Sequence, residues 1–291
     1  MPDGSEELSP PIHGLKPHVE LFRSGRSSQV DVPQRFQEQF GILSEGVYPT
    51  DPIQRMQQDG YNPVMIGYDH PFDQGDVPSI QKRLLELKEK NPDKTLKVAH
   101  EIIPPIQLAW IKDFLTVTEE YKTKGTMHGK IPDHVPEDPN AYRAKLRRNH
   151  AENLALWMLE QGFDVVPLDS PDVEKWISED NTRAYGDNRQ ALTAIRRDNY
   201  GLNVMDKERP DIITTGNAHA IKYDMLLERD GSNSYYFMER LGDWNDILDL
   251  WQGAHQQYKN PGMKAPSSSD SGSYGSFKGS GLSRNIFEEE D

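Results

Sequence analysis

The sequence of 291 residues contains no cysteine. This absence excludes disulfide bonds, thiolate metal ligands and a cysteine nucleophile. Long apolar runs are lacking as well, because no stretch approaches the roughly 20 residues that a membrane-spanning helix needs. The acidic N-terminus has no apolar core of the kind found in signal peptides. We therefore expect a cytoplasmic protein without a membrane span.

Positive charge is scarce. The chain has 33 Lys and Arg residues against 47 Asp and Glu residues, which gives a formal net charge of −14. A nucleic-acid groove needs a contiguous basic surface. The one basic cluster, within residues 143–148, has the spacing of a solvated helix face. The charge balance therefore predicts that nucleic acid is not a partner.

Hydrophobic residues make up 35% of the chain, which is below the usual fraction for a globular domain. The deficit lies at the two ends. Residues 1–45 are rich in Pro, Ser, Gly and charge, and residues 259–291 are rich in Ser and Gly before an acidic terminus. We predict a flexible N-terminal segment (1–45), a single α/β domain (46–258) and a disordered acidic tail (259–291). The termini are candidate docking segments for a partner protein.

Short apolar runs alternate along the domain with amphipathic helical patterns. A run of four to six apolar or β-branched residues is typical of a buried strand, and the longer stretches with apolar residues on one face are typical of helices. The expected strands are 63–66, 95–99, 163–168, 211–215 and 235–238. This alternation predicts an α/β fold with a mostly parallel central sheet, flanked by helices on both faces.

Two Gly-x-x-His tetrads follow expected strands. They are Gly67-Tyr68-Asp69-His70 and Gly216-Asn217-Ala218-His219, whereas a third copy that ends at His128 lies in an expected loop. Glu101 also follows an expected strand. Because ligand sites in parallel sheets lie outside the carboxyl ends of the strands, we expect His70, Glu101 and His219 to form one site.

The residue types at these strand ends suit two kinds of chemistry. Neutral imidazoles with a carboxylate can hold Mn²⁺, Co²⁺, Fe²⁺ or Zn²⁺, or they can act as an acid/base cluster. Gly67 and Gly216 are expected to let the backbone turn sharply before each histidine. His219 falls in the first turn of a helix, where the dipole favours neutral imidazole. His100, next to Glu101, is expected to face the opposite side of its strand and to be structural.

The order of these motifs resembles the superfamily that includes the TraB-type proteins, the TIKI metalloproteases, the haem-associated ChaN proteins and the erythromycin esterases. The family pattern has two strands that are each followed by Gly-x-x-His, a strand that ends in Glu, and a helix with an Arg-(Asp/Asn)-x-x-Met-Ala stretch. Here the tetrads, Glu101 and Arg189 look like these elements, with Arg183 as the competitor of Arg189. Gln190 departs from the pattern, which has Asp or Asn at that position. The resemblance covers roughly residues 60–255.

The resemblance implies metal-dependent hydrolysis of a peptide or ester bond, metal-free His/Glu chemistry, or ligand binding. In the hydrolase interpretation His70, Glu101 and His219 hold a divalent metal, and Glu101 or Asp69 accepts the proton of the attacking water. Arg189 then stabilises the oxyanion. The substrate is a peptide or a small molecule. Two alternatives stay open: a non-catalytic binding or regulatory protein that uses its termini, and a small-molecule binder that holds a haem-like ligand through one histidine.

Overall fold

The structure is a computed structural model that describes part of the chain. The described residues are 18–21, 26–29, 46–68, 76–101, 105–124, 150–173, 175–176, 188–229, 233–238, 255 and 258–259. The strands are β1 (His18–Leu21), β2 (Arg26–Gln29), β3 (Val64–Tyr68), β4 (Lys97–His100), β5 (Asp164–Pro167), β6 (Ile212–Gly216) and β7 (Ser234–Met238). The helices are α2 (Thr50–Gln58), α3 (Asp76–Lys90), α4 (Pro105–Lys124), α6 (His150–Glu160), α8 (Asn188–Glu208) and α9 (Asn217–Leu226).

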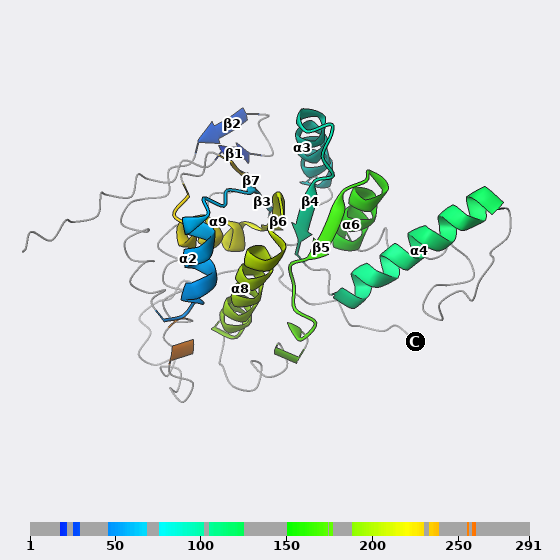
Figure 1. Cartoon of the computed structure of the whole chain (residues 1–291). Coiled ribbons are helices and arrows are strands. Elements are labelled where there is room, and N and C mark those ends of the chain that lie inside the picture. Colours follow the sequence, from blue (N-terminus) through cyan, green and yellow to red (C-terminus); the bar gives the residue numbers. More distant parts are fainter. Residues whose placement is uncertain are drawn as a thin grey trace, which may run out of the picture.

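These strands form one seven-stranded sheet in the order β2-β1-β7-β3-β6-β4-β5 (Figure 1). Every neighbouring pair is parallel except β1 and β2, which are antiparallel. The prediction of a mostly parallel α/β sheet is confirmed. The strands that precede the three expected site residues, β3, β6 and β4, are direct neighbours, so their carboxyl ends meet at one edge.

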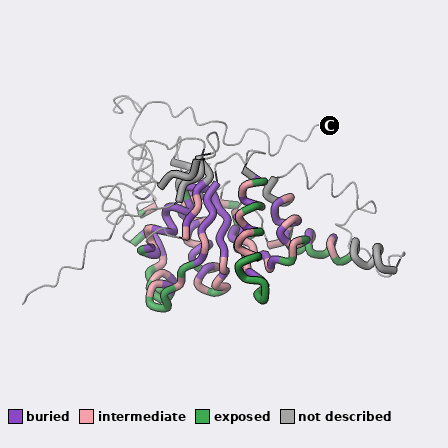
Figure 2. The backbone as a smooth tube through the Cα atoms, turned by 90° about the horizontal axis from the view of Figure 1, so that it is seen from above, coloured by how far each residue is buried: buried purple, intermediate pink, exposed green. Residues whose placement is uncertain are grey.

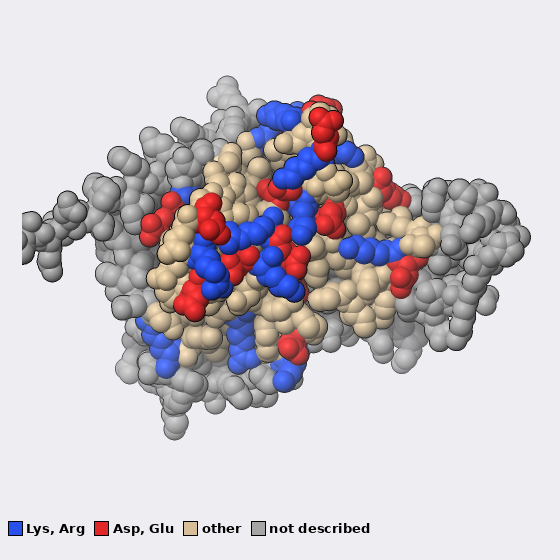
Figure 3. All heavy atoms as spheres, viewed as in Figure 1, with Lys and Arg blue, Asp and Glu red and all other residues tan. Residues whose placement is uncertain are grey.

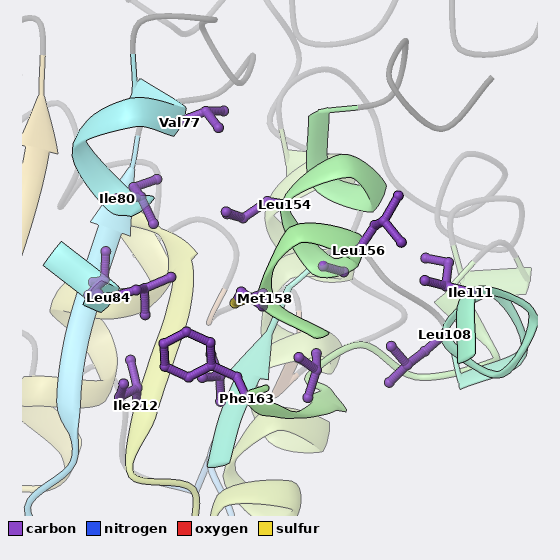
Figure 4. Packing of buried hydrophobic residues seen from close by; sticks show 14 of the residues in the cluster. Val77, Ile80, Leu84, Leu108, Ile111, Leu154, Leu156, Met158, Phe163 and Ile212 are labelled. Atoms are coloured by element: carbon purple, nitrogen blue, oxygen red, sulfur yellow. The ribbon is translucent and has the colours of Figure 1, made fainter. Parts of the chain in front are cut away.

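Helices cover both faces of the sheet because successive strand residues point to opposite sides. Ile213 of β6 packs in a cluster with residues of α2, α8 and α9. Its neighbour Ile212 packs on the other face with residues of α3, α4 and α6, as Figure 4 shows. The strands therefore run through the buried centre, with the exposed residues on the outer sides of the helices (Figure 2).

The order of elements follows the sequence patterns, but three differences are informative. The helical pattern of residues 183–198 predicts a helix that ends near 198, but α8 continues for ten more residues because Leu202 and Met205 extend its buried face. Helix α2 lies in a segment for which no helix was predicted. Strands β1 and β2 lie in the segment 1–45, for which no strand was predicted. Each is too short for a periodic pattern to stand out.

Gly67 is required for packing, and the expectation of a sharp backbone turn at this position is wrong. The residue lies inside β3, paired with Thr215 of β6, and its φ is not in the left-handed region. A Cβ at this position would overlap the Asn217 side-chain oxygen and would lie 2.8 Å from Cδ1 of Tyr236. Gly216 likewise has an ordinary φ of −59° and ψ of 145°. The first tetrad thus has glycine because α9 packs closely against β3.

We expect Gly67→Ala to lower the free energy of unfolding by about 1–3 kcal/mol, since an overpacked core must shift its neighbours. Urea denaturation of the purified protein measures this cost. The same substitution in an Asn217→Ala background should cost less, because the nearest obstructing atom is then gone. Equal costs in the two backgrounds would mean that α9 is not what excludes a side chain at position 67.

Among the described residues, no helix combines the length and the apolar character needed to cross a membrane. Acidic and basic side chains interleave on the face shown in Figure 3. Part of this mixture consists of ion pairs that connect α2 and its end to the end of α8. Arg55 binds Asp206 at 2.6 Å, and Arg209 binds Asp59 at 2.7 Å.

Candidate functional site

Adjacent strands bring Glu101 and His219 together at the carboxyl edge of the sheet. Glu101 directly follows β4, and its backbone N–H still donates to the Thr214 carbonyl at 3.0 Å. His219 is the third residue of α9, which begins where β6 ends. Both side chains are buried, and His219 Nε2 lies 3.6 Å from Glu101 Oε1. The parallel pairing of β4 with β6 therefore places the two predicted groups side by side.

Each oxygen of the Glu101 carboxylate has a fixed partner. Oε1 accepts a hydrogen bond from Arg197 Nη2 at 2.5 Å. Oε2 accepts one from the Thr215 hydroxyl at 2.5 Å and another from the backbone N–H of Gly216. These donors come from α8 and from the end of β6. The carboxylate is thus held in one orientation, with Oε1 facing the His219 ring.

Arg197 connects Glu101 to a second carboxylate. Its Nε and Nη2 donate to Asp169 at 2.8 and 2.9 Å in a bidentate pair. Burial opposes the charge of the guanidinium, but Glu101 and Asp169 outweigh that effect, so the pKa of Arg197 lies above its ordinary value. The Nη1 atom of Arg197 takes part in none of the three hydrogen bonds to Glu101 and Asp169. The three bonds use Nε and Nη2 alone.

Asp198 orients the ring of His219 from the opposite side. Its carboxylate is wholly buried and binds His219 Nδ1 and the Lys222 ammonium. Burial works against the charged form, but Lys222 and His219 outweigh it and hold the pKa of Asp198 below its usual value. An ionised carboxylate only accepts hydrogen bonds, so Nδ1 carries a proton. In the neutral ring, Nε2 therefore presents a lone pair toward Glu101.

Among the described residues, His219 and Glu101 are the pair that could share a cation. The Nε2 lone pair and Oε1 are both acceptors, and 3.6 Å separates them. Two ligands with bonds of about 2.1 Å to one ion lie at about this separation. The carboxylates of Glu101, Asp169 and Asp198 outnumber the cations Arg197 and Lys222 by one, so the cluster with neutral His219 has a negative charge. A proton or a metal ion would balance it.

The space between these side chains is a small recess. It is lined by Glu101, Leu168, Asp169, Arg197, Thr215, His219 and Tyr223. Tyr223 stacks on the His219 ring, with 6.5 Å between ring centroids. Within the described part of the chain, the side chains fill the recess so closely that it has no room for a water molecule.

Two other predicted residues, Asp69 and His70, lie outside the described residues. Across the described part of the chain, no group of three or more His, Asp or Glu side chains is arranged to hold a metal. Any third ligand beside Glu101 and His219 must come from elsewhere, and His70 remains the predicted one. Its strand, β3, lies next to β6 on the side away from β4.

The arginine that contacts Glu101 is Arg197, whereas the sequence favoured Arg189. Arg189 is the second residue of α8, and its side chain lies outside the described part. Eight residues separate the two arginines, which is about 12 Å along a helix. The sequence did contain a signal for Arg197. Arg197 is followed by Asp198, which is the acidic residue at the second position of the family pattern, whereas Arg189 is followed by Gln190. Sequence reasoning also missed Asp169 and Lys222, whose residue types have no distinctive spacing.

His100 lies on the opposite face of the sheet from Glu101, as strand alternation predicts. It is fully buried, and its Nδ1 lies 2.6 Å from the Thr214 hydroxyl on the neighbouring strand. It therefore joins β4 to β6.

No protein-family profile, curated protein or solved structure matches this chain significantly.

Proposed function

We propose that this protein is a hydrolase of peptide or ester bonds whose site consists of His219, Glu101 and Arg197. The observation that supports this most strongly is the orientation of His219. Asp198 holds Nδ1, so that Nε2 faces Glu101 beside the guanidinium of Arg197. A base that is oriented by a carboxylate next to a fixed cation is the combination that acyl transfer to water requires.

The chain's own groups have distinct roles in this proposal. His219 Nε2 accepts a proton from the attacking water, and Asp198 stabilises the imidazolium that forms. Arg197 Nη1 approaches the substrate oxygen that becomes negative in the tetrahedral intermediate. His219 then returns its proton to the leaving group. Glu101 keeps Arg197 in position and attracts the positive charge that develops on the ring.

A divalent metal fits the same donors. Glu101 and His219 are the described residues that would hold it, with His70 as the third predicted ligand, and the metal would supply Lewis acidity that lowers the pKa of water. The resemblance to the TraB and TIKI superfamily supports hydrolysis, and Arg197-Asp198 has the acidic second residue of the family pattern, which Arg189-Gln190 lacks. Peptide and ester substrates both suit this chemistry.

Turnover of a p-nitrophenyl ester and of a fluorogenic peptide mixture tests the proposal. In Glu101→Gln and His219→Gln we expect turnover to fall by about 10²–10⁴-fold, as is typical when a positioned acid or base is lost. Elemental analysis of the wild type, His70→Ala and His219→Gln measures bound metal in parallel. Circular dichroism verifies that each variant is folded.

Glu89→Gln provides the matched control, because Glu89 is an exposed carboxylate on α3, away from the cluster. It should leave turnover and metal content unchanged. Wild-type turnover that persists in both Glu101→Gln and His219→Gln would refute the site. Metal content that is unchanged in His70→Ala and His219→Gln would refute the metal-dependent form while leaving the acid/base form standing.

A second candidate, a binding protein without turnover, is favoured by one observation: the side chains fill the recess, as an ion-paired structural cluster would. It predicts that the wild type hydrolyses neither probe. Removal of residues 1–17, which precede β1, and of residues 260–291 should then abolish partner binding while the folded domain remains. A haem-like ligand on one histidine would give visible absorption in the purified protein.

A further inference from the structure

A second hydrogen-bonded chain reaches Asp198 from outside the recess. His255 Nε2 lies 3.1 Å from the Tyr48 hydroxyl, and the two buried rings meet edge to face with 5.5 Å between centroids. The Tyr48 hydroxyl is in turn hydrogen-bonded to Asp198. Tyr48 precedes α2, whereas His255 is near the other end of the described chain. Residues from both ends of the domain therefore meet at the carboxylate that orients His219.

The proton positions along this chain follow from Asp198. Since its carboxylate is ionised and accepts only, the Tyr48 hydroxyl must donate to it. A phenol has a single proton, so the Tyr48 oxygen accepts its second bond, and His255 Nε2 must be the donor. Burial chiefly, and then the negative charge of Asp198, raises the pKa of Tyr48 well above its ordinary value. Tyr48 thus remains a neutral donor at neutral pH.

A second contact fixes the same two segments to α8. The Asn199 side-chain amide donates to the Val47 carbonyl at 3.1 Å and to the Tyr258 hydroxyl at 3.2 Å. Val47 and Tyr48 also belong to the core cluster on this face of the sheet, and Tyr258 packs against it. Asn199 directly follows Asp198 along the helix. The two segments therefore hold α8 at the turn that presents Asp198 to His219.

We infer that Tyr48 and His255 are positioning residues of the His219 site. Three donors surround the Asp198 carboxylate, namely Tyr48, His219 and Lys222, and each fixes the direction in which the others bind. His255 in turn fixes the Tyr48 hydroxyl. Tyr48 and His255 act on the reaction only through Asp198. The effect on turnover rests on the proposed function, whereas the effect on the His219 ring does not.

Nitrogen-15 NMR of full-length protein with labelled histidine tests this inference without a substrate. The His219 Nδ1–H resonance is assigned by its loss in His219→Gln. Tyr48→Phe removes one hydroxyl and keeps the ring. We expect it to move the His219 resonance downfield, because the carboxylate then shares its charge between two donors and binds each more strongly. His255→Phe should move it in the same direction by less.

Tyr61→Phe is the matched control, since it removes a hydroxyl on the same face of the sheet that donates to the Pro210 carbonyl and not to Asp198. It should leave the resonance unmoved. A folded Tyr48→Phe protein with an unshifted His219 signal, or an equal shift in Tyr61→Phe, would overturn the inference. If Tyr48→Phe does not fold, the His219 resonance is measured in His255→Phe instead. A downfield shift then supports the inference, and an unshifted resonance overturns it.

Turnover provides a separate measurement. On the ester probe, Tyr48→Phe should lower kcat about tenfold with little change in KM, the usual size of effect for partners that orient a site histidine. An inactive wild type that nevertheless shows the NMR shifts would refute the proposed hydrolase and leave the positioning role intact. An active wild type without the shifts would refute the positioning role alone.

Discussion

Asp198→Asn should lower the free energy of unfolding by about 3–5 kcal/mol, the cost of breaking a buried ion pair by removing one partner. Asp198 is wholly buried and Lys222 is 2% exposed, so little solvent can replace the lost carboxylate. Lys222→Met should be destabilising for the same reason. The double variant removes both charges, and we expect it to be more stable than the sum of the two single effects predicts, by up to about 3 kcal/mol.

Urea denaturation of the full-length protein measures these differences. The matched control is Asp206→Asn, eight residues later on the same helix, where the ion pairs with the partly exposed Arg55 and Arg209 should contribute far less than the buried pair. Strict additivity of Asp198→Asn and Lys222→Met would contradict the interpretation that the two charges stabilise the fold as a pair.

The same carboxylate should make stability depend on pH in one direction. Because the pKa of Asp198 is lowered in the folded protein, its contribution is fully present above the unfolded value of about 4 and is lost as pH falls through the folded value. The difference in unfolding free energy between the wild type and Asp198→Asn should therefore shrink below about pH 4. A difference that grows on acidification would show that the sign of the shift is wrong.

Asp224→Asn should also destabilise the protein by about 3–5 kcal/mol, because Asp224 balances the buried Arg229. The Asp224 carboxylate binds Arg229 and accepts hydrogen bonds from the Ser234 and Tyr236 hydroxyls of β7. Arg229 also donates to the Asn62 side chain at 2.9 Å and to the Pro63 carbonyl. The group therefore joins α9 to β7 and to the entry of β3.

Tyr236→Phe is the control for this network, since it removes one of the hydroxyl donors to Asp224 without removing a charge and should cost about 1 kcal/mol. Both variants are compared by urea denaturation. A cost below about 1 kcal/mol for Asp224→Asn would mean that Arg229 finds another counter-charge, and it would remove this network from the account of stability.

The fold and two members of the site could be predicted from sequence because they depend on local pattern. Buried strands such as β6 consist of consecutive apolar and β-branched residues, and Glu101 and His219 follow strands directly. Strand alternation also placed His100 on the opposite face. None of these inferences required knowledge of how α8 packs.

The remaining members depend on that packing. Arg197, Asp198 and Lys222 are polar residues inside helices, where a sequence normally gives no reason to expect burial. The burial of Asp198 and Lys222, and the partial burial of Arg197, follow from the rotation of α8 and α9 about their axes. The reason for Gly67 was missed for the same cause, because the close approach of α9 to β3 is a contact between distant segments.

The strand order also has a consequence for how this chain is made. The last two strands, β6 and β7, each lie between strands that precede them, β6 between β3 and β4, and β7 between β1 and β3. During translation, β3 and β4 are therefore expected to leave the ribosome with unpaired edges. More than 100 further residues must be synthesised before β6 can pair with both of them. Nascent chains stalled before residue 212 should bind chaperones and resist compaction, and those stalled well after residue 238 should not.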